Sequence, residues 1–153
     1  MLSSMNKSFK VRIYPTRGQQ VLLEKTFGAN RFIYNYFLNL KSKLYEFYKI
    51  SLNNINCSKV LTELKKQKTW LKEVDAVSLQ QTLRDLDSAY QNFFNGRGKY
   101  PKFKRKDGKN SYRANMNLSL NTDNHIIKIP KVGSIRFRDK SRFRDVTKIY
   151  SIT

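Results

Sequence analysis

The stretch from Gly96 to Lys106 combines the two side-chain chemistries that bind nucleic acids. Lysine and arginine neutralise phosphates and release counterions, whereas aromatic rings stack on bases or anchor a loop to a core. Seven basic residues and one aspartate fall between Arg97 and Lys109, interleaved with Tyr100, a proline and Phe103. A solubilising charge run seldom has this composition, so the segment is interpreted as a nucleic-acid contact, with Phe103 as its anchor to the core. The candidate binding residues here are Arg97, Lys99, Tyr100, Lys102, Lys104, Arg105, Lys106 and, just beyond, Arg113.

The acidic residues lack the arrangement that metal-dependent phosphoryl transfer needs, which is three or four carboxylates converging on one cleft. Asp75, Asp85 and Asp87 lie on or beside one expected helix, where capping and ion pairing explain them. Cys57 and His125 are the single cysteine and the single histidine, which excludes a disulfide within the chain and a zinc site built on two or more cysteines. We interpret Cys57 as a small residue near a helix start. The sequence predicts no catalytic residue, metal or cofactor.

The charge of the chain points to a polyanionic partner. Its 153 residues hold 31 Lys+Arg and 11 Asp+Glu, for a formal charge of +20, while 39% hydrophobic and 13% aromatic residues suffice for a core. Residues 96–153 are the denser part, with 16 basic and 4 acidic residues. No apolar run approaches the roughly 18 residues of a membrane span, so we expect no membrane partner and a cytoplasmic, in bacteria nucleoid-associated, location.

Helical signals fill the first two thirds of the chain. Thr16 and Gln19 resemble a capping box, and apolar residues at helical spacing then predict one or two helices as far as Phe47, with a bend expected at Gly28. Tyr34 and Tyr45 fall off the apolar stripe and are secondary candidates for a partner contact.

Two further helices are expected after a polar break. Ser58 is a plausible N-cap for a short one. Asp75 caps a longer one, which stops at Asn95-Gly96.

Strand signals open and close the chain. Alternation over residues 9–14 predicts a strand that Pro15 ends. Later alternation predicts strands over residues 112–120, 126–129, 135–138 and 146–152. The order predicts an α+β fold in which a helical block interrupts a β domain and the first strand pairs with the last ones. The expected units are residues 1–15, first strand; 16–95, helical domain; 96–111, basic loop; and 112–153, remaining strands.

Five ordered blocks of the sequence resemble one known family. They are FKVRIYP at 9–15, FGANRFIYN at 27–35, WLKEVD at 70–75, LQQTLRDL at 79–86, and FF at 93–94 running into the basic loop. With this spacing the chain, from about residue 6 onward, is similar to the N-terminal part of TnpB. TnpB proteins are transposon-encoded RNA-guided nucleases, also called OrfB transposases with an N-terminal helix-turn-helix domain, and they resemble compact type V CRISPR effectors.

The resemblance implies a fold and a division of labour. The strands would form a wedge-type β-barrel, complete or unfinished at Thr153, and the helices a recognition domain inserted in it. In the family a RuvC-like nuclease domain with a zinc ribbon follows the wedge domain, so this chain is expected to stop before it and to lack catalytic activity.

The resemblance also implies partners. The wedge and recognition parts would hold the scaffold of a guide RNA from the transposon right end and read a short transposon-adjacent motif in double-stranded DNA, while base pairing reads the rest. By position, Gln80 and Asn117 fall where the family meets that duplex, and Gln80 has the side-chain amide that pairs with adenine. Two alternatives are a stand-alone helix-turn-helix DNA-binding regulator that needs no RNA and a relic that folds poorly. The oligomeric state is not predicted.

Overall fold

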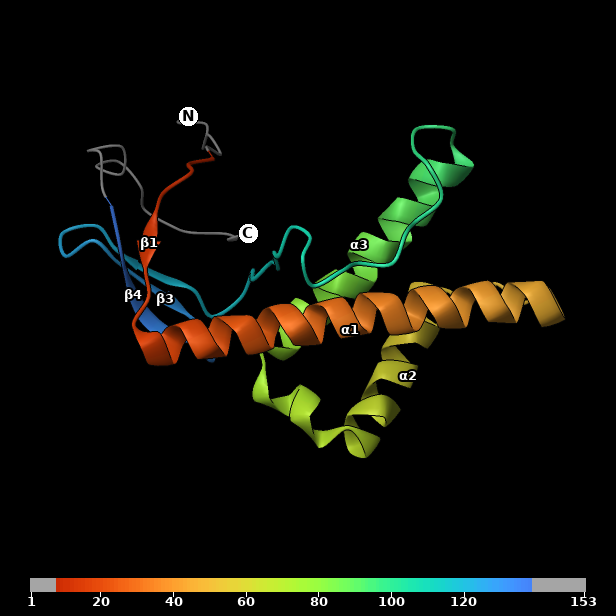
Figure 1. Ribbon diagram of the computed structural model, residues 1–153, viewed down its shortest axis with the longest axis horizontal. Helices are drawn as coiled ribbons and strands as arrows, with labels where there is room; N and C mark the ends of the chain where they lie inside the picture. Colours follow the sequence, from red (N-terminus) through yellow and green to blue (C-terminus); the bar gives the residue numbers. More distant parts are fainter. Residues whose placement is uncertain (1–7, 139–153) are drawn as a thin grey trace, which may run out of the picture.

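The computed structural model describes residues 8–138, which form a group of helices beside a small antiparallel sheet (Figure 1). The elements in chain order are β1 (Ile13–Tyr14), α1 (Arg17–Tyr48), α2 (Asn54–Gln67), the 3-10 helix η1 (Thr69–Glu73), α3 (Ala76–Phe94), β2 (Ser119–Asn121), β3 (Ile126–Ile129) and β4 (Gly133–Phe137). This order confirms the α+β prediction. The strand expected at 146–152 lies outside the described residues.

Helix α1 is one element of 32 residues. The predicted capping box is confirmed: the Thr16 hydroxyl accepts from the Gln19 amide at 3.3 Å, and the Gln19 side chain accepts from the Thr16 amide at 2.9 Å. The helix continues through Gly28. A lone glycine costs about 1 kcal/mol relative to alanine, which the packing of the neighbouring Ala29 and Ile33 in the core offsets.

Helix α2 starts five residues earlier than predicted. Asn53 is its N-cap, with the side-chain oxygen accepting from the Asn56 amide at 2.8 Å, and Ser58 lies inside the helix with its hydroxyl bonded to the Asn54 carbonyl at 3.1 Å. The Ser58 cap was therefore wrong, because Asn53 caps the first free amides of the helix five residues earlier and leaves Ser58 inside it. For α3 the cap is confirmed, since Asp75 accepts from the Val77 amide at 3.3 Å.

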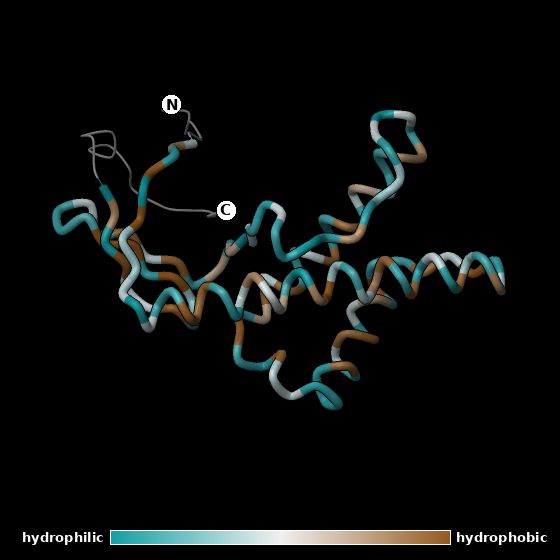
Figure 2. Tube along the Cα trace, in the orientation of Figure 1, coloured by the Kyte–Doolittle hydropathy of each residue, from teal (hydrophilic) through white to brown (hydrophobic). Residues whose placement is uncertain are grey.

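The three helices share one apolar core. Its fully buried side chains come from α1, α2, η1 and α3, and include Ile33, Phe37, Leu61, Leu71, Leu79, Leu83 and Leu86. Hydrophobic and hydrophilic positions alternate along the helices (Figure 2). No helix within residues 8–138 combines the length and apolar character needed to cross a bilayer.

The sheet has the strand order β1-β4-β3-β2 with every pair antiparallel. Ile13 lies opposite Phe137, which confirms that the first strand pairs with a later one. A second core lies under it, made by Leu23 of α1 together with Ile127, Ile129, Val132, Ile135 and Phe137.

Among the described residues this sheet is open, and the expected wedge-type barrel is not formed. β1 and β2 are its two edges and do not pair with each other. The strand expected from residue 112 onward is also shorter than predicted, because Asn117 adopts a left-handed φ of 56° that interrupts the extended backbone.

Candidate nucleic-acid interface

Residues 96–111, which we name the basic strap, run back along α1 in the opposite chain direction. Three polar contacts hold them. The Tyr100 hydroxyl lies 2.8 Å from the Ser42 hydroxyl, Asn35 binds the backbone of Lys104, and Arg31 Nη1 donates to Asn110 Oδ1 at 3.1 Å. Positions 31, 35 and 42 share one face of α1 because four and eleven residues are close to whole helical turns.

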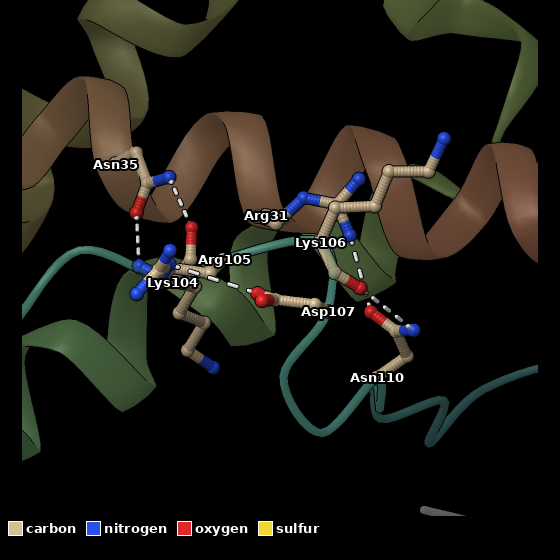
Figure 3. Close-up of polar contacts among 7 residues, drawn as sticks. All are labelled: Arg31, Asn35, Lys104, Arg105, Lys106, Asp107 and Asn110. Atoms are coloured by element: carbon tan, nitrogen blue, oxygen red, sulfur yellow. Dashed lines mark hydrogen bonds and ion pairs between the residues drawn. The ribbon is translucent and has the colours of Figure 1, made fainter.

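The central contact involves both backbone groups of Lys104 (Figure 3). Asn35 Nδ2 donates to the Lys104 carbonyl at 2.9 Å, and the Lys104 amide donates to Asn35 Oδ1 at 2.7 Å. The ammonium of Lys104 lies 4.4 Å from the centroid of the Tyr34 ring, within cation–π range. Tyr34 is itself buried, and burial raises the pKa of its hydroxyl, as does the charge of Asp85 to a smaller extent. Tyr34 therefore supports the strap from beneath, whereas Tyr45 is exposed.

Between α1, α3 and the basic strap lies a cleft with a cavity volume of about 90 Å³. Its acidic lining residue is Asp85, which lies 3.6 Å from Arg113 Nη1. The cationic residues that line it come from α1, the strap and the segment after it: Arg31, Lys104, Arg105, Lys109 and Arg113. Five cations against one carboxylate make the cleft suited to a phosphate group.

A buried polar network fixes the walls of this cleft. Asn30 on α1 donates to Ser78 Oγ at 3.2 Å and accepts from the Thr82 hydroxyl on α3. Ser78 in turn donates to the Asp75 carbonyl at 2.7 Å. Buried polar groups are costly unless they are paired, so this network holds the two helices in one relative placement.

Tyr112, another lining residue, has a largely buried hydroxyl. Burial, with a smaller contribution from the charge of Asp75, raises the pKa of Tyr112 to about 12. Its phenol therefore stays protonated at the edge of the cleft.

The structure brings some of the predicted residues together. Lys104, Arg105 and Arg113 line the cleft, and Tyr100 packs in an aromatic cluster at the end of α3. Arg97, Lys99, Lys102 and Lys106 are exposed along the strap. The prediction for Phe103 was wrong: its side chain is 58% exposed, because the Asn35 bonds hold the strap through its backbone at the next residue.

The two candidate base-reading residues lie away from the cleft lining. Gln80 is half-buried between helices, and its Oε1 accepts from the Ser58 hydroxyl at 2.8 Å. Asn117 is exposed in its left-handed conformation before β2. The residues that sequence reasoning missed are the α1 anchors Arg31, Asn35 and Ser42. Their shared helical face was the signal available for them.

Cys57 is buried in the helical core. Burial raises the pKa of its thiol, which outweighs the lowering by Lys41 and is reinforced by Asp87. The side chain is therefore a packing element in the first turns of α2.

Comparison with known proteins identifies the family of the chain. A family model described as a helix-turn-helix domain, that of the IS605 OrfB proteins, matches residues 1–49. The virulence protein VsdF of Salmonella dublin is 38% identical over 116 residues, which cover 69% of this chain and 98% of that protein. The chain belongs to the TnpB (OrfB) family.

Two longer relatives in this comparison are described as candidate RNA-guided DNA endonucleases. One from Streptomyces pristinaespiralis is 39% identical over 106 residues, covering 68% of this chain and 26% of the relative. InsQ of Escherichia coli (strain K12) is 29% identical over 149 residues, covering 96% of this chain and 37% of the relative. This TnpB-family chain thus spans between a quarter and two fifths of the length of these relatives.

The matched segment has a different local structure from its description. Within residues 8–49 the TnpB-family chain forms β1 and the single helix α1, so its described part holds no pair of helices joined by a turn. Helix α3 packs against both α1 and α2. Of these three helices only α1 lies within the matched residues 1–49.

Proposed function

We propose that this chain binds nucleic acid as the wedge and recognition part of a TnpB-type RNA-guided system, contacting the scaffold of the guide RNA and the transposon-adjacent DNA motif without cutting DNA itself. The observation that carries the proposal is the basic strap fastened to α1. Three polar anchors hold it, two through the side chains of Tyr100 and Asn110 and one through the backbone of Lys104, so its cations are kept beside α1 and the cleft. A loop needed only for solubility has no reason to be ordered in this way.

The cleft supplies the phosphate site of this proposal. Arg31, Lys109 and Arg113 reach it from three different segments, and guanidinium groups bind phosphate oxygens with two parallel hydrogen bonds. Such contacts position a backbone and carry no sequence information.

Base reading is assigned in this proposal to Gln80 and Asn117. A bidentate contact of Gln80 with adenine uses both the oxygen and the nitrogen of its amide. In the free chain the Gln80 oxygen accepts a hydrogen bond from Ser58 of α2. Binding of adenine would replace that bond and so remove one contact between α3 and α2.

The test is the salt dependence of binding. Replacing Lys102, Lys104, Arg105 and Lys106 by alanine removes four charges, and each phosphate contact adds about 0.9 to the slope of log affinity against log salt on duplex DNA and about 0.7 on single strands. We expect the slope to flatten by roughly two to four units. The matched control replaces four exposed lysines on α1, α2 and η1, namely Lys43, Lys59, Lys66 and Lys72.

An equal flattening in both variants would show that net charge alone acts, and an unchanged slope would return the strap to a solubilising role. Binding of a palindromic DNA site without RNA would favour the stand-alone regulator instead.

A further inference from the structure

Four aromatic rings meet where α3 ends and the basic strap begins. We name Tyr90, Phe93, Phe94 and Tyr100 the aromatic tip. The ring centroids lie 5.2 Å apart for Phe93 and Tyr100, 5.4 Å for Phe93 and Phe94, 5.6 Å for Tyr90 and Tyr100, and 6.3 Å for Tyr90 and Phe94. This end of α3 and the returning strap project from the rest of the molecule (Figure 1).

Much of the aromatic tip faces solvent. Phe94 is 73% exposed, Tyr100 45% and Phe93 38%, while Tyr90 is buried beneath them. Exposing apolar rings to water is unfavourable in free energy, so a contiguous exposed patch of them marks an interaction surface.

The rings are held in place before any partner arrives. The Tyr100 hydroxyl lies 2.8 Å from that of Ser42 and 3.2 Å from that of Tyr90, and the Lys41 ammonium lies 5.2 Å from the Tyr90 ring centroid. The chain reversal is also closed: Gly96 takes a φ of 71°, and the Arg97 amide donates to the Asn92 carbonyl at 2.8 Å. A preorganised surface loses little conformational freedom on binding.

The charge around the aromatic tip selects the partner. Between Asp87 and Asp107 the sequence has no acidic residue, and Asp87 is paired with Lys41 at 3.8 Å. The basic residues Arg97, Lys99 and Lys102 alternate with the turn and ring residues and are exposed. A partner protein with an apolar surface would not require this excess of cations. A nucleic-acid strand would use both, the rings for its bases and the cations for its phosphates.

We propose that the aromatic tip is a stacking platform for unpaired nucleotides, with their bases on Phe93 and Phe94 and their phosphates on Arg97, Lys99 and Lys102. The proposal rests on the proposed nucleic-acid function and adds the kind of strand and the place where it lies. Bases within a duplex are already stacked on each other, so exposed phenyl rings recognise single-stranded segments.

The test uses a 12-nucleotide oligouridine RNA carrying one 2-aminopurine, compared with a 12-base-pair RNA duplex. We expect Phe94→Ala to weaken binding of the single strand about 5- to 100-fold, with the duplex affinity changed less than twofold. Stacking quenches 2-aminopurine fluorescence. The quenching expected with the unsubstituted chain should therefore be lost in Phe94→Ala and retained in Phe94→Trp. Phe47→Ala is the matched control, because Phe47 is 68% exposed at the end of α1, outside the aromatic tip.

The outcomes separate this proposal from the one on which it rests. If the chain binds both probes with a steep salt slope but Phe94→Ala changes neither affinity nor quenching, the platform is wrong and the strap proposal stands. Equal losses on the single strand and the duplex, or an equal loss in Phe47→Ala, also overturn the platform. If the chain binds neither probe, both proposals fail.

Discussion

Asn35 and Lys104, 69 residues apart in the sequence, form a two-bond pair in which one side-chain amide satisfies the amide and the carbonyl of a single backbone position. An asparagine in the middle of α1 thus satisfies the backbone of the irregular basic strap, in the way that a paired strand satisfies the backbone of its neighbour in a sheet. The pair lies between the two other attachments of the basic strap to α1, at Arg31 and Ser42. Together the three attachments hold the strap against the helix.

Removing this pair should loosen the strap. We expect Asn35→Ala to lower the free energy of unfolding by about 1–2 kcal/mol, since two net hydrogen bonds are lost, and to speed trypsin cleavage after Lys102, Lys104 and Arg105. Denaturant unfolding and timed digestion measure the two effects. Asn39→Ala, at an exposed position of the same helix, should change neither. Unchanged cleavage in Asn35→Ala would show that the strap is held by other contacts.

Gln80 and Ser58 allow a structural role to be separated from base reading. If the bond between them at 2.8 Å is all that Gln80 contributes, Gln80→Ala and Ser58→Ala should each cost about 1 kcal/mol of stability and leave DNA motif preference unchanged. Under the base-reading proposal Gln80→Ala also removes about 1–3 kcal/mol of discrimination between one duplex motif and its single-base variants, and Ser58→Ala does not. The measurement is binding of the chain, together with a right-end RNA, to a panel of duplex motifs.

Leu83 provides the reference for a core defect. It is 2% exposed in the helical core, so Leu83→Ala should lower stability by about 2–5 kcal/mol. Thermal or denaturant unfolding measures this. A cost for Gln80→Ala as large as that of Leu83→Ala would place Gln80 in the core and leave Asn117 as the candidate base reader.

Cys57 should be inert in the folded chain. It is 1% exposed and its thiol pKa is raised by burial, so the reactive thiolate is scarce and inaccessible at pH 7–8. We expect labelling by a thiol reagent to be slower by orders of magnitude than in denaturant, where the one cysteine should react fully. Fast labelling of the native chain would mean that α2 opens readily from the core.

Incubation of the chain with duplex DNA, Mg²⁺ and a right-end RNA should give no strand cleavage above a buffer control. The described residues contain no group of three His, Cys, Asp or Glu side chains placed to hold a metal ion, and phosphoryl transfer of this type relies on such a group. Gel analysis of labelled DNA checks the prediction. Reproducible, divalent-dependent cutting by homogeneous protein would contradict it.

Short-range signals in the sequence were enough for much of the fold. The Thr16–Gln19 capping box, the Asp75 cap and the stop at Asn95-Gly96 each depend on residues within one turn of each other, and all three hold in the structure. One exception is α2, whose cap was predicted at Ser58 and lies at Asn53, five positions earlier.

Composition and residue order determined the charge of this protein, its helical and β segments, its basic loop and its family. They could not place the loop, because the contacts that hold it join residues 58 to 79 positions apart, and such pairs depend on how α1 and α3 pack. The tertiary structure decided that Phe103 faces solvent, that Gln80 binds Ser58 and that Arg31 reaches the cleft. The physical reason is that hydrogen bonds and burial act over a few ångströms of space, whereas helical periodicity and capping act over a few residues of chain.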